Sequence, residues 1–336
     1  MINLRKSIIT ICLLTATTLR AQVTYFGTNN FFLNYLTDTG FSGYDWRYEP
    51  LKTDVERGGL KGKVYKVVTN IEDKTNRGWG DNFCDTAYYD AMGNITKVVA
   101  LKKDQYSPEI KYNPDLWIYA YNTNGTLLSY VIQKEDYIYG GQGKTLNRHV
   151  HTMSLNNQGR ILQEIYKAYE KQGNAWKPFD GSLDDVSWTF SYDTSGNLTG
   201  GYEHLHQLNL TYLNGQLTKM ESRGEEIKPV TFSYNSEGQM IGCRYFQLDE
   251  WEGDEFRSEI EVVMRYNEHG HLVGAIENTW DCAANWSRVK LTNNVTYSVS
   301  YTYDNKDNWT KAIMYSLSNN SPREIAFTIN REISYK

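Results

Sequence analysis

One seven-residue turn pattern recurs along most of this chain, and it constrains the fold more than any other feature. The pattern is Tyr-(Asp/Asn)-x-x-Gly-x-apolar, and the segment 192–198 is its fullest copy. Asp or Asn can cap a turn by accepting a hydrogen bond from a backbone N–H two residues later. Glycine supplies the positive φ that closes a type I turn with a bulge. The copies, some of them imperfect, begin at Tyr89, Tyr121, Leu155, Tyr192, Tyr212, Tyr234, Tyr266 and Tyr303.

The glycine position of this motif predicts where each tight turn lies. In the last copy Asp307 stands in place of glycine, and Asp tolerates a positive φ better than most residues. The pattern also places the first Tyr opposite the final apolar residue across each hairpin. The predicted structural turn residues are Gly93, Gly125, Gly159, Gly196, Gly215, Gly238, Gly270 and Asp307.

The segments between the turns alternate with a period of two residues, as β-strands do. Before Gly196, for example, Val186, Trp188 and Phe190 share one face, and the residues between them are polar. No stretch has a sustained helical period with caps. We therefore predict an all-β chain of tandem antiparallel β-hairpins with almost no helix.

The beginning of the chain is typical of a secretory signal peptide. Residues 1–21 hold a basic start, an apolar stretch and the small residue Ala21 before a predicted cleavage site. Residues 22–58 are aromatic and lack the motif, so we interpret them as a lead-in segment that caps one end of the sheet. Residues 59–336 form the predicted repeat domain. Cleavage removes three cations and no anion, which moves the net charge from -5 to -8 and disfavours nucleic acid as a partner.

The repeated turn motif resembles the YD repeat of bacterial Rhs-type and wall-associated proteins, which also occurs in animal teneurins. The resemblance covers roughly residues 59–336. It implies one long sheet that curls or spirals, and it implies carbohydrate binding. Eight copies are too few for the closed shell of full-size Rhs proteins, so that shell and its toxin-delivery role are not expected here.

All six histidines occur as His-x-His pairs. Residues two apart on a strand point to the same face, so each pair could present two imidazoles to one metal ion. We single out His149, His151, His204 and His206, and we expect the pair at 269 and 271 to be exposed beside its turn. The alternative is that histidine replaces tyrosine in an aromatic ladder. Because no Cys or carboxylate completes a ligand spacing nearby, no cofactor is expected, and a metal ion stays the open alternative.

Aromatic side chains are the best candidates for ligand contacts, because their flat faces can stack on sugar rings. Trp117 and Tyr119 alternate on one predicted strand face, and Trp176, Trp251 and Trp286 lie on long hairpin arms. The alternative is that these rings pack against neighbouring hairpins.

These observations favour an exported, non-enzymatic binding or scaffold module for a glycan or a protein at the cell surface. The predicted location is the periplasm, the outer-membrane surface or the extracellular space, with the membrane contacted only by association. A first alternative is an outer-membrane β-barrel of about 16 strands. Charges on several candidate lipid-facing strand faces speak against it. A second alternative is a metal-binding protein or metal-dependent enzyme that uses the His-x-His pairs.

Overall fold

The computed structural model describes most of the chain from residue 54 onward, and the statements below concern that part. The described residues are 54–57, 59–74, 83–101, 114–137, 144–178, 185–203, 208–214, 216–222, 228–251, 254–318 and 321–336. Within them, no helix is long and apolar enough to cross a membrane.

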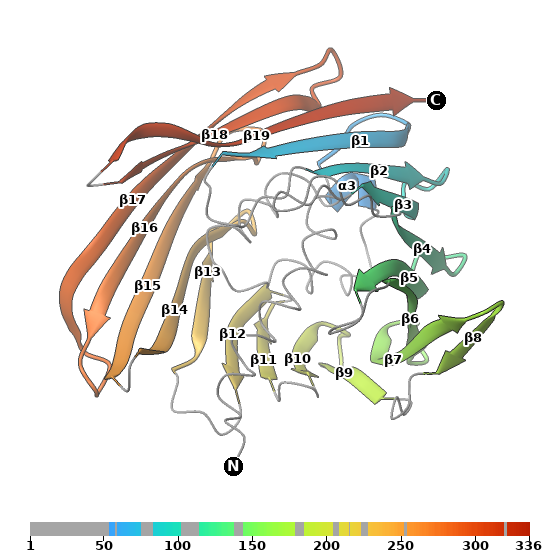
Figure 1. The fold of residues 1–336 in the computed structure, drawn as a ribbon, viewed down its shortest axis with the longest axis horizontal. Helices are drawn as coiled ribbons and strands as arrows, with labels where there is room; N and C mark the ends of the chain where they lie inside the picture. The colour runs from blue at the N-terminus through green and yellow to red at the C-terminus, as the bar shows by residue number, and fades with distance from the viewer. Residues whose placement is uncertain are drawn as a thin grey trace.

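The described residues form one short helix and nineteen strands (Figure 1). The helix is α3, Asp54–Arg57. The strands are β1 Val64–Asp73, β2 Phe83–Tyr89, β3 Ile95–Leu101, β4 Asp115–Tyr121, β5 Leu127–Tyr137, β6 Lys144–Leu155, β7 Ile161–Gln172, β8 Ala175–Pro178, β9 Asp185–Tyr192 and β10 Leu198–Glu203. They continue as β11 Leu208–Leu213, β12 Gln216–Ser222, β13 Val230–Tyr234, β14 Met240–Trp251, β15 Asp254–Tyr266, β16 Leu272–Cys282, β17 Arg288–Tyr303, β18 Trp309–Ser318 and β19 Ser321–Tyr335.

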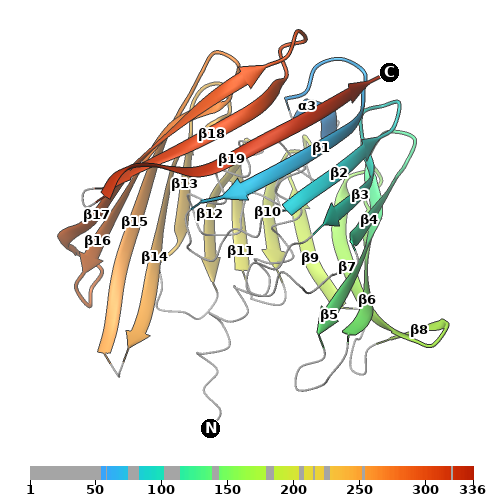
Figure 2. The same ribbon diagram turned by 45° about the horizontal axis from the view of Figure 1, so that its top comes forward.

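The strands close into a barrel. Each strand of the wall pairs antiparallel with its neighbours in the chain, and β1 pairs with β19 from Val64–Tyr335 to Asp73–Phe327. Strand β8 pairs only with β7, which also pairs with β9, so the closed ring contains 18 strands (Figures 1 and 2). The prediction of a curled or spiralling open sheet was therefore wrong, although the all-β antiparallel class is confirmed.

Closure also corrects what the resemblance implied. A barrel in which the first strand pairs with the last has no free edge from which further hairpins could be added. The fold thus conflicts with the description of this chain as a YD-type or Rhs-type repeat protein. Each copy of the motif brings two strands, and eight copies are therefore enough for a wide ring.

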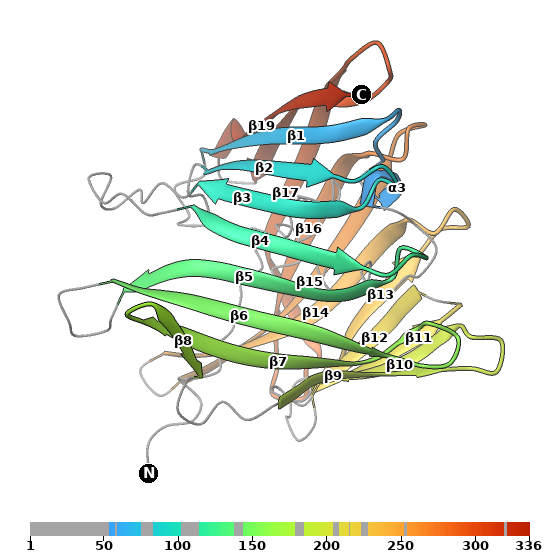
Figure 3. The same ribbon diagram turned by 90° about the vertical axis from the view of Figure 1, so that its right-hand side faces the viewer.

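All copies of the turn motif lie on one rim of the barrel, because the motif occurs once in every two strands of an up-and-down order. We call this the motif rim; Figure 3 shows it on the right for β2 to β7. In the copy at Tyr192, the Asp193 N–H donates to the Asn197 carbonyl at 2.9 Å and the Gly196 N–H donates back to Asp193 at 2.9 Å. Positive φ values occur at Gly93, Gly125, Gly159, Gly196, Gly238, Gly270 and Asp307. Gly215 lies outside the described residues.

Tyrosine hydroxyls connect successive copies of the motif. Tyr192 Oη donates to the carbonyl of Ile161 at 2.7 Å, and Tyr266 Oη donates to the carbonyl of Met240 at 2.6 Å. Each accepting residue is the last position of the preceding motif. Both carbonyls lie beyond the last pairs of the ladder with the strand that carries the tyrosine, Gly242–Val263 and Gln163–Thr189, so the phenol supplies the hydrogen-bond donor there.

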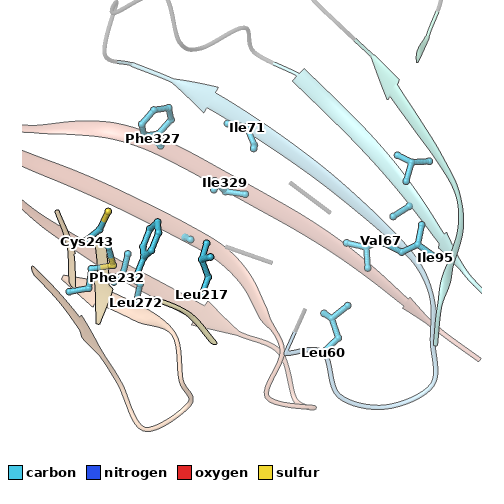
Figure 4. Close-up of a cluster of buried hydrophobic side chains, with 14 of the residues drawn as sticks. Leu60, Val67, Ile71, Ile95, Leu217, Phe232, Cys243, Leu272, Phe327 and Ile329 are labelled. Atoms are coloured by element: carbon cyan, nitrogen blue, oxygen red, sulfur yellow. The ribbon is translucent and has the colours of Figure 1, made fainter. Parts of the chain in front are cut away.

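The buried face of every long strand points into the ring. Side chains from strands all around the wall belong to one hydrophobic cluster that includes Leu60, from the segment after α3. Figure 4 labels ten of these side chains, which are Leu60 and nine residues on strands from different parts of the wall. Val98, Val262, Leu272, Ala312 and Met314 have no exposed surface.

The outer face of the wall is rich in polar and charged side chains. Lys97, Lys311 and Glu332 are exposed, and each is next in sequence to a buried inner residue. The same alternation places Lys66, Lys167, Lys219, Arg244, Glu261 and Arg265 on the outer face. The inner face is therefore apolar, whereas the outer face mixes charged residues with exposed apolar ones such as Leu101, Ile118 and Val263.

Candidate binding surface

The histidine pair on β6 lies inside the barrel and belongs to an aromatic network. His151 Nδ1 lies 2.6 Å from Glu164 Oε1, which also accepts a hydrogen bond from Tyr130 at 3.1 Å. The His151 ring stacks on Tyr130 with centroids 4.2 Å apart, and His149 Nδ1 lies 2.7 Å from the Tyr166 hydroxyl. These contacts are those expected if histidine takes a place in an aromatic ladder.

The metal hypothesis gains no support from this geometry. Among the described residues, no group of three or more His, Cys, Asp and Glu side chains is placed to hold a metal ion. His204 and His206 lie outside the described residues, so the structure does not place the second pair.

The third histidine pair lies on the motif rim. His269 is exposed, as expected, but His271 is only 7% exposed, so the prediction for this residue was wrong. His271 Nδ1 lies 2.9 Å from the Tyr303 hydroxyl of the next turn. Burial, with smaller contributions from His269 and Arg331, lowers the pKa of His271 to about 4. The ring is therefore neutral near pH 7 and acts as a structural link between turns.

The predicted aromatic ligand contacts are spread over three parts of the molecule. Trp117 and Tyr119 face the barrel interior and are 1% and 6% exposed. Trp176 lies on the β7–β8 hairpin, which extends from the wall on the side away from β17 (Figure 1), and its ring lies 5.8 Å from the Arg148 guanidinium. Trp251 ends β14, and its side chain lies outside the described residues. Trp286 occupies the β16–β17 turn.

Trp286 belongs to a cluster on the outer face of β14 to β17, which we call the outer patch. The register places Phe246 opposite Glu259 and Glu259 opposite Trp280, so the three side chains form one row across neighbouring strands. Trp286 packs edge-on against Phe246 with ring centroids 5.4 Å apart. Arg288, at the start of β17, completes the cluster.

The turn that carries Trp286 has the hydrogen bonds of the motif turns without their sequence. The Ala283 N–H donates to Ser287 at 3.0 Å and the Trp286 N–H donates to Ala283 at 2.8 Å. Trp286 occupies the position that glycine takes elsewhere, with a φ of 63°. A bulky residue in this conformation is strained by about 1–3 kcal/mol, and such strain is concentrated at functional sites. Trp286 is nevertheless only 8% exposed.

A buried carboxylate organises the charges of the outer patch. The Glu259 side chain has no exposed surface, and its Oε1 accepts hydrogen bonds from Arg244 Nε at 2.6 Å and from Arg288 Nε at 2.9 Å. Burial acts to raise the pKa of Glu259, but the two arginines outweigh it and hold that pKa below its usual value. Glu259 is therefore ionised near pH 7.

Two polar atoms of the outer patch have no hydrogen-bond partner among the described residues. They are Glu259 Oε2 and Trp280 Nε1, on side chains that are neighbours across β15 and β16. One is an acceptor and the other a donor, so each lacks a partner of the opposite kind. A buried polar atom without a partner costs about 1–3 kcal/mol, which favours a bound hydroxyl or water at this place.

Cations surround the aromatic rings of the outer patch. Lys228 Nζ lies 5.3 Å from the Phe246 ring centre, Arg257 lies 5.7 Å from Trp286, and Arg288 lies 4.8 Å from Trp280. With Arg244 these give four cations against the two carboxylates Glu259 and Glu261. The patch is thus positive on a chain whose formal charge is negative, and it combines aromatic faces with donors for an anion.

Sequence reasoning found only one member of this patch. Trp286 was predicted to contact ligand, but Phe246, Glu259, Trp280 and Arg288 were not singled out. Trp280 lies six residues before Trp286 and Arg288 lies two residues after it, and this nearness to the turn is the signal that could have pointed to them. The sequence could not reveal what β14 and β15 contribute to the patch, because this depends on the register in which the strands pair.

Comparison with known proteins gives little further information. No family model matches the chain, and no curated protein matches it. One solved structure with detectable likeness is a crystal structure of a porin-like protein from Bacteroides uniformis, at 11% sequence identity over 81% of this chain and 96% of that one, with a TM-score of 0.24. A likeness at that TM-score carries no weight in the argument below.

Proposed function

We propose that this chain is an exported β-barrel of the cell envelope that acts by binding, and that the outer patch is its binding surface. The single observation that carries the proposal is the pair of partnerless atoms Glu259 Oε2 and Trp280 Nε1 amid aromatic rings and cations. The ligand class that fits is an acidic glycan. Its hydroxyl groups suit the two atoms, its ring faces suit the aromatics, and its carboxylates suit the arginines.

The charge on the outer wall supports a barrel whose outside is in water. A Lys or Arg on a lipid-facing strand costs about 2–4 kcal/mol at the middle of a bilayer. Lys97, Arg244, Arg265 and Lys311 are exposed on strands from different parts of the wall. Burying all four at the middle of a bilayer would cost about 8–16 kcal/mol, which is comparable with the whole stability of an ordinary domain, about 5–15 kcal/mol.

Binding to a glycan array tests the proposal, with the mature protein, residues 22–336, as the probe. We expect acidic glycans to be retained, and Arg257→Gln and Trp280→Phe each to weaken binding at least 10-fold. Trp176→Phe, on the far side of the barrel, is the matched control and should bind normally. Retention of no acidic glycan, or equal binding by all three variants, would reject the outer patch as the binding surface.

A second candidate function is an outer-membrane β-barrel, and the topology favours it. The ring has an even number of strands in up-and-down order, the first and last strands pair, and the motif turns all lie on one rim. Outer-membrane barrels have the same order, with short turns at one rim. Fractionation decides between the two: an integral barrel stays in the membrane pellet after a carbonate wash, whereas the proposed water-facing barrel is released.

A further inference from the structure

The chain segment that leads into β1 is fastened to the last turn of the motif rim. We call this segment, residues 59–63, the seam segment, because β1 starts directly after it and pairs with β19 where the barrel closes. The Lys61 N–H donates to Asn308 Oδ1 at 2.6 Å, and Asn308 Nδ2 donates back to the Lys61 carbonyl at 2.9 Å. The Lys61 ammonium also forms an ion pair with Asp307. These contacts hold the seam segment on the turn.

His271, on the preceding turn of the motif rim, lies between the seam segment and β17. A Cβ atom added to Gly59 would lie 3.6 Å from His271 Nε2. The other ring nitrogen, Nδ1, lies 2.9 Å from the Tyr303 hydroxyl, whose oxygen accepts a hydrogen bond from Asn267 Nδ2 at 3.2 Å. The proton of this hydroxyl is therefore available for His271 Nδ1, which accepts it when the ring is neutral.

The surroundings of His271 disfavour a proton on its ring. The titratable and charged groups around it are His269 on the same turn, Tyr301 and Tyr303 on β17, Asp307 on the last turn, Lys61 on the seam segment and Arg331 on β19. Lys61 and Arg331 are cations, and the one carboxylate, Asp307, is already paired with Lys61. A protonated imidazole thus meets more positive than negative charge. Protonation also turns Nδ1 from an acceptor into a donor, so the Tyr303 proton loses its acceptor.

We propose that acid loosens the barrel at its seam: when His271 gains a proton, the seam segment detaches from the last turn while the strands of the wall stay paired. The opening is local because side-chain contacts fasten the seam segment, whereas a backbone ladder holds each wall strand. The pKa of His271, about 4 in the folded protein, is below its ordinary value of 6.5, so the fastening is complete above pH 6.5 and is lost as the pH falls toward 4. This device goes beyond the proposed binding function and does not depend on it.

Hydrogen exchange of the mature protein, labelled at pH 7 and at pH 4.5, tests the proposal without any ligand. Mass spectrometry of peptic fragments gives the protection of each segment, corrected for the intrinsic exchange rate at each pH. We expect the protection of the seam segment to fall by about 10-fold or more at pH 4.5. Residues 122–126, a motif turn that contains no histidine, should keep their protection.

Two variants separate the titration of His271 from the other fastenings. In His271→Gln, whose amide gains no proton, the seam segment should be equally protected at both pH values. In the matched control Asp307→Asn, which removes the ion pair with Lys61, protection should be lower at both pH values and should still fall in acid. Equal protection of the unmodified seam segment at both pH values would overturn the proposal. An equal loss in His271→Gln, or one that extends to residues 122–126, would also overturn it. If His271→Gln does not fold, the two segments of the unmodified protein decide.

Discussion

The hydroxyl of Tyr266 donates a 2.6 Å hydrogen bond to the carbonyl of Met240, which ends the preceding turn motif 26 residues earlier. Tyr192 makes the same contact with Ile161. The excess of tyrosine in this chain therefore has a structural cause beyond strand propensity. A phenylalanine would fill the same space, but it would leave the carbonyl without its donor.

Removing these hydroxyls should destabilise the barrel. Tyr192→Phe and Tyr266→Phe are each expected to lower the free energy of unfolding by about 1–2 kcal/mol, because each leaves a half-buried carbonyl without its donor. Urea denaturation followed by tryptophan fluorescence measures the loss. Tyr65→Phe, at an exposed ring on β1, is the control and should change the midpoint little. Equal midpoints for all three variants would show that the phenol contacts are not stabilising.

A turn glycine tests the conformational requirement of the motif. Gly159 has a φ of 75°, and a side chain added there would meet no atom within 4 Å. Gly159→Ala should therefore cost about 1 kcal/mol from backbone strain alone. Gly159→Asn should cost less, because Asn tolerates this region and Asn214 adopts it in the β11–β12 turn. The thermal midpoints of the two variants measure the difference, and a more stable Ala variant would contradict the turn assignment.

The buried His271 predicts an acid-sensitive rim. Its pKa is about 4 in the folded protein and about 6.5 when unfolded, so the unfolded chain binds the extra proton between these values. The free energy of unfolding that neutral His271 contributes is fully present above pH 6.5. It falls by about 2–3 kcal/mol as the pH drops toward 4. Urea midpoints at pH 7 and pH 4.5 should differ less in His271→Gln than in the unmodified protein. An unchanged pH dependence would show that His271 does not titrate as proposed.

The buried carboxylate of the outer patch should hold Trp286 in its strained turn. Glu259→Gln removes the charge that pairs Arg244 with Arg288, at an expected cost of about 1–3 kcal/mol because both arginines are part-exposed. Tryptophan emission should shift to longer wavelength as Trp286 becomes wetter. Glu261→Gln, on a carboxylate that is more exposed, is the matched control. The same emission from both variants would contradict the organising role of Glu259.

The sequence predicts the strands and the turn positions well, because the alternation and the motif are local signals. It fails on closure, since the pairing of Val64 with Tyr335 joins residues that no local pattern relates. It also failed for His271, because the Tyr303 hydroxyl that covers the ring comes from another hairpin. The outer patch was missed for the same reason: Phe246 and Trp280 meet only through the register of three strands.

Two neighbouring valines on β15 test the central claim that the barrel wall is apolar inside and water-facing outside. Val262 has no exposed surface and faces the interior, whereas Val263 is 47% exposed on the outer wall. Urea denaturation of Val262→Lys and Val263→Lys, in buffer without detergent, measures how much the same substitution lowers the free energy of unfolding on each face of the wall. The account predicts that Val262→Lys fails to fold or loses at least 3 kcal/mol, because an unpaired charge is buried, and that Val263→Lys stays within about 0.5 kcal/mol of the unmodified protein. A tolerated lysine at 262 together with a severe loss at 263 would mean a polar interior and a lipid-facing wall, and would contradict it.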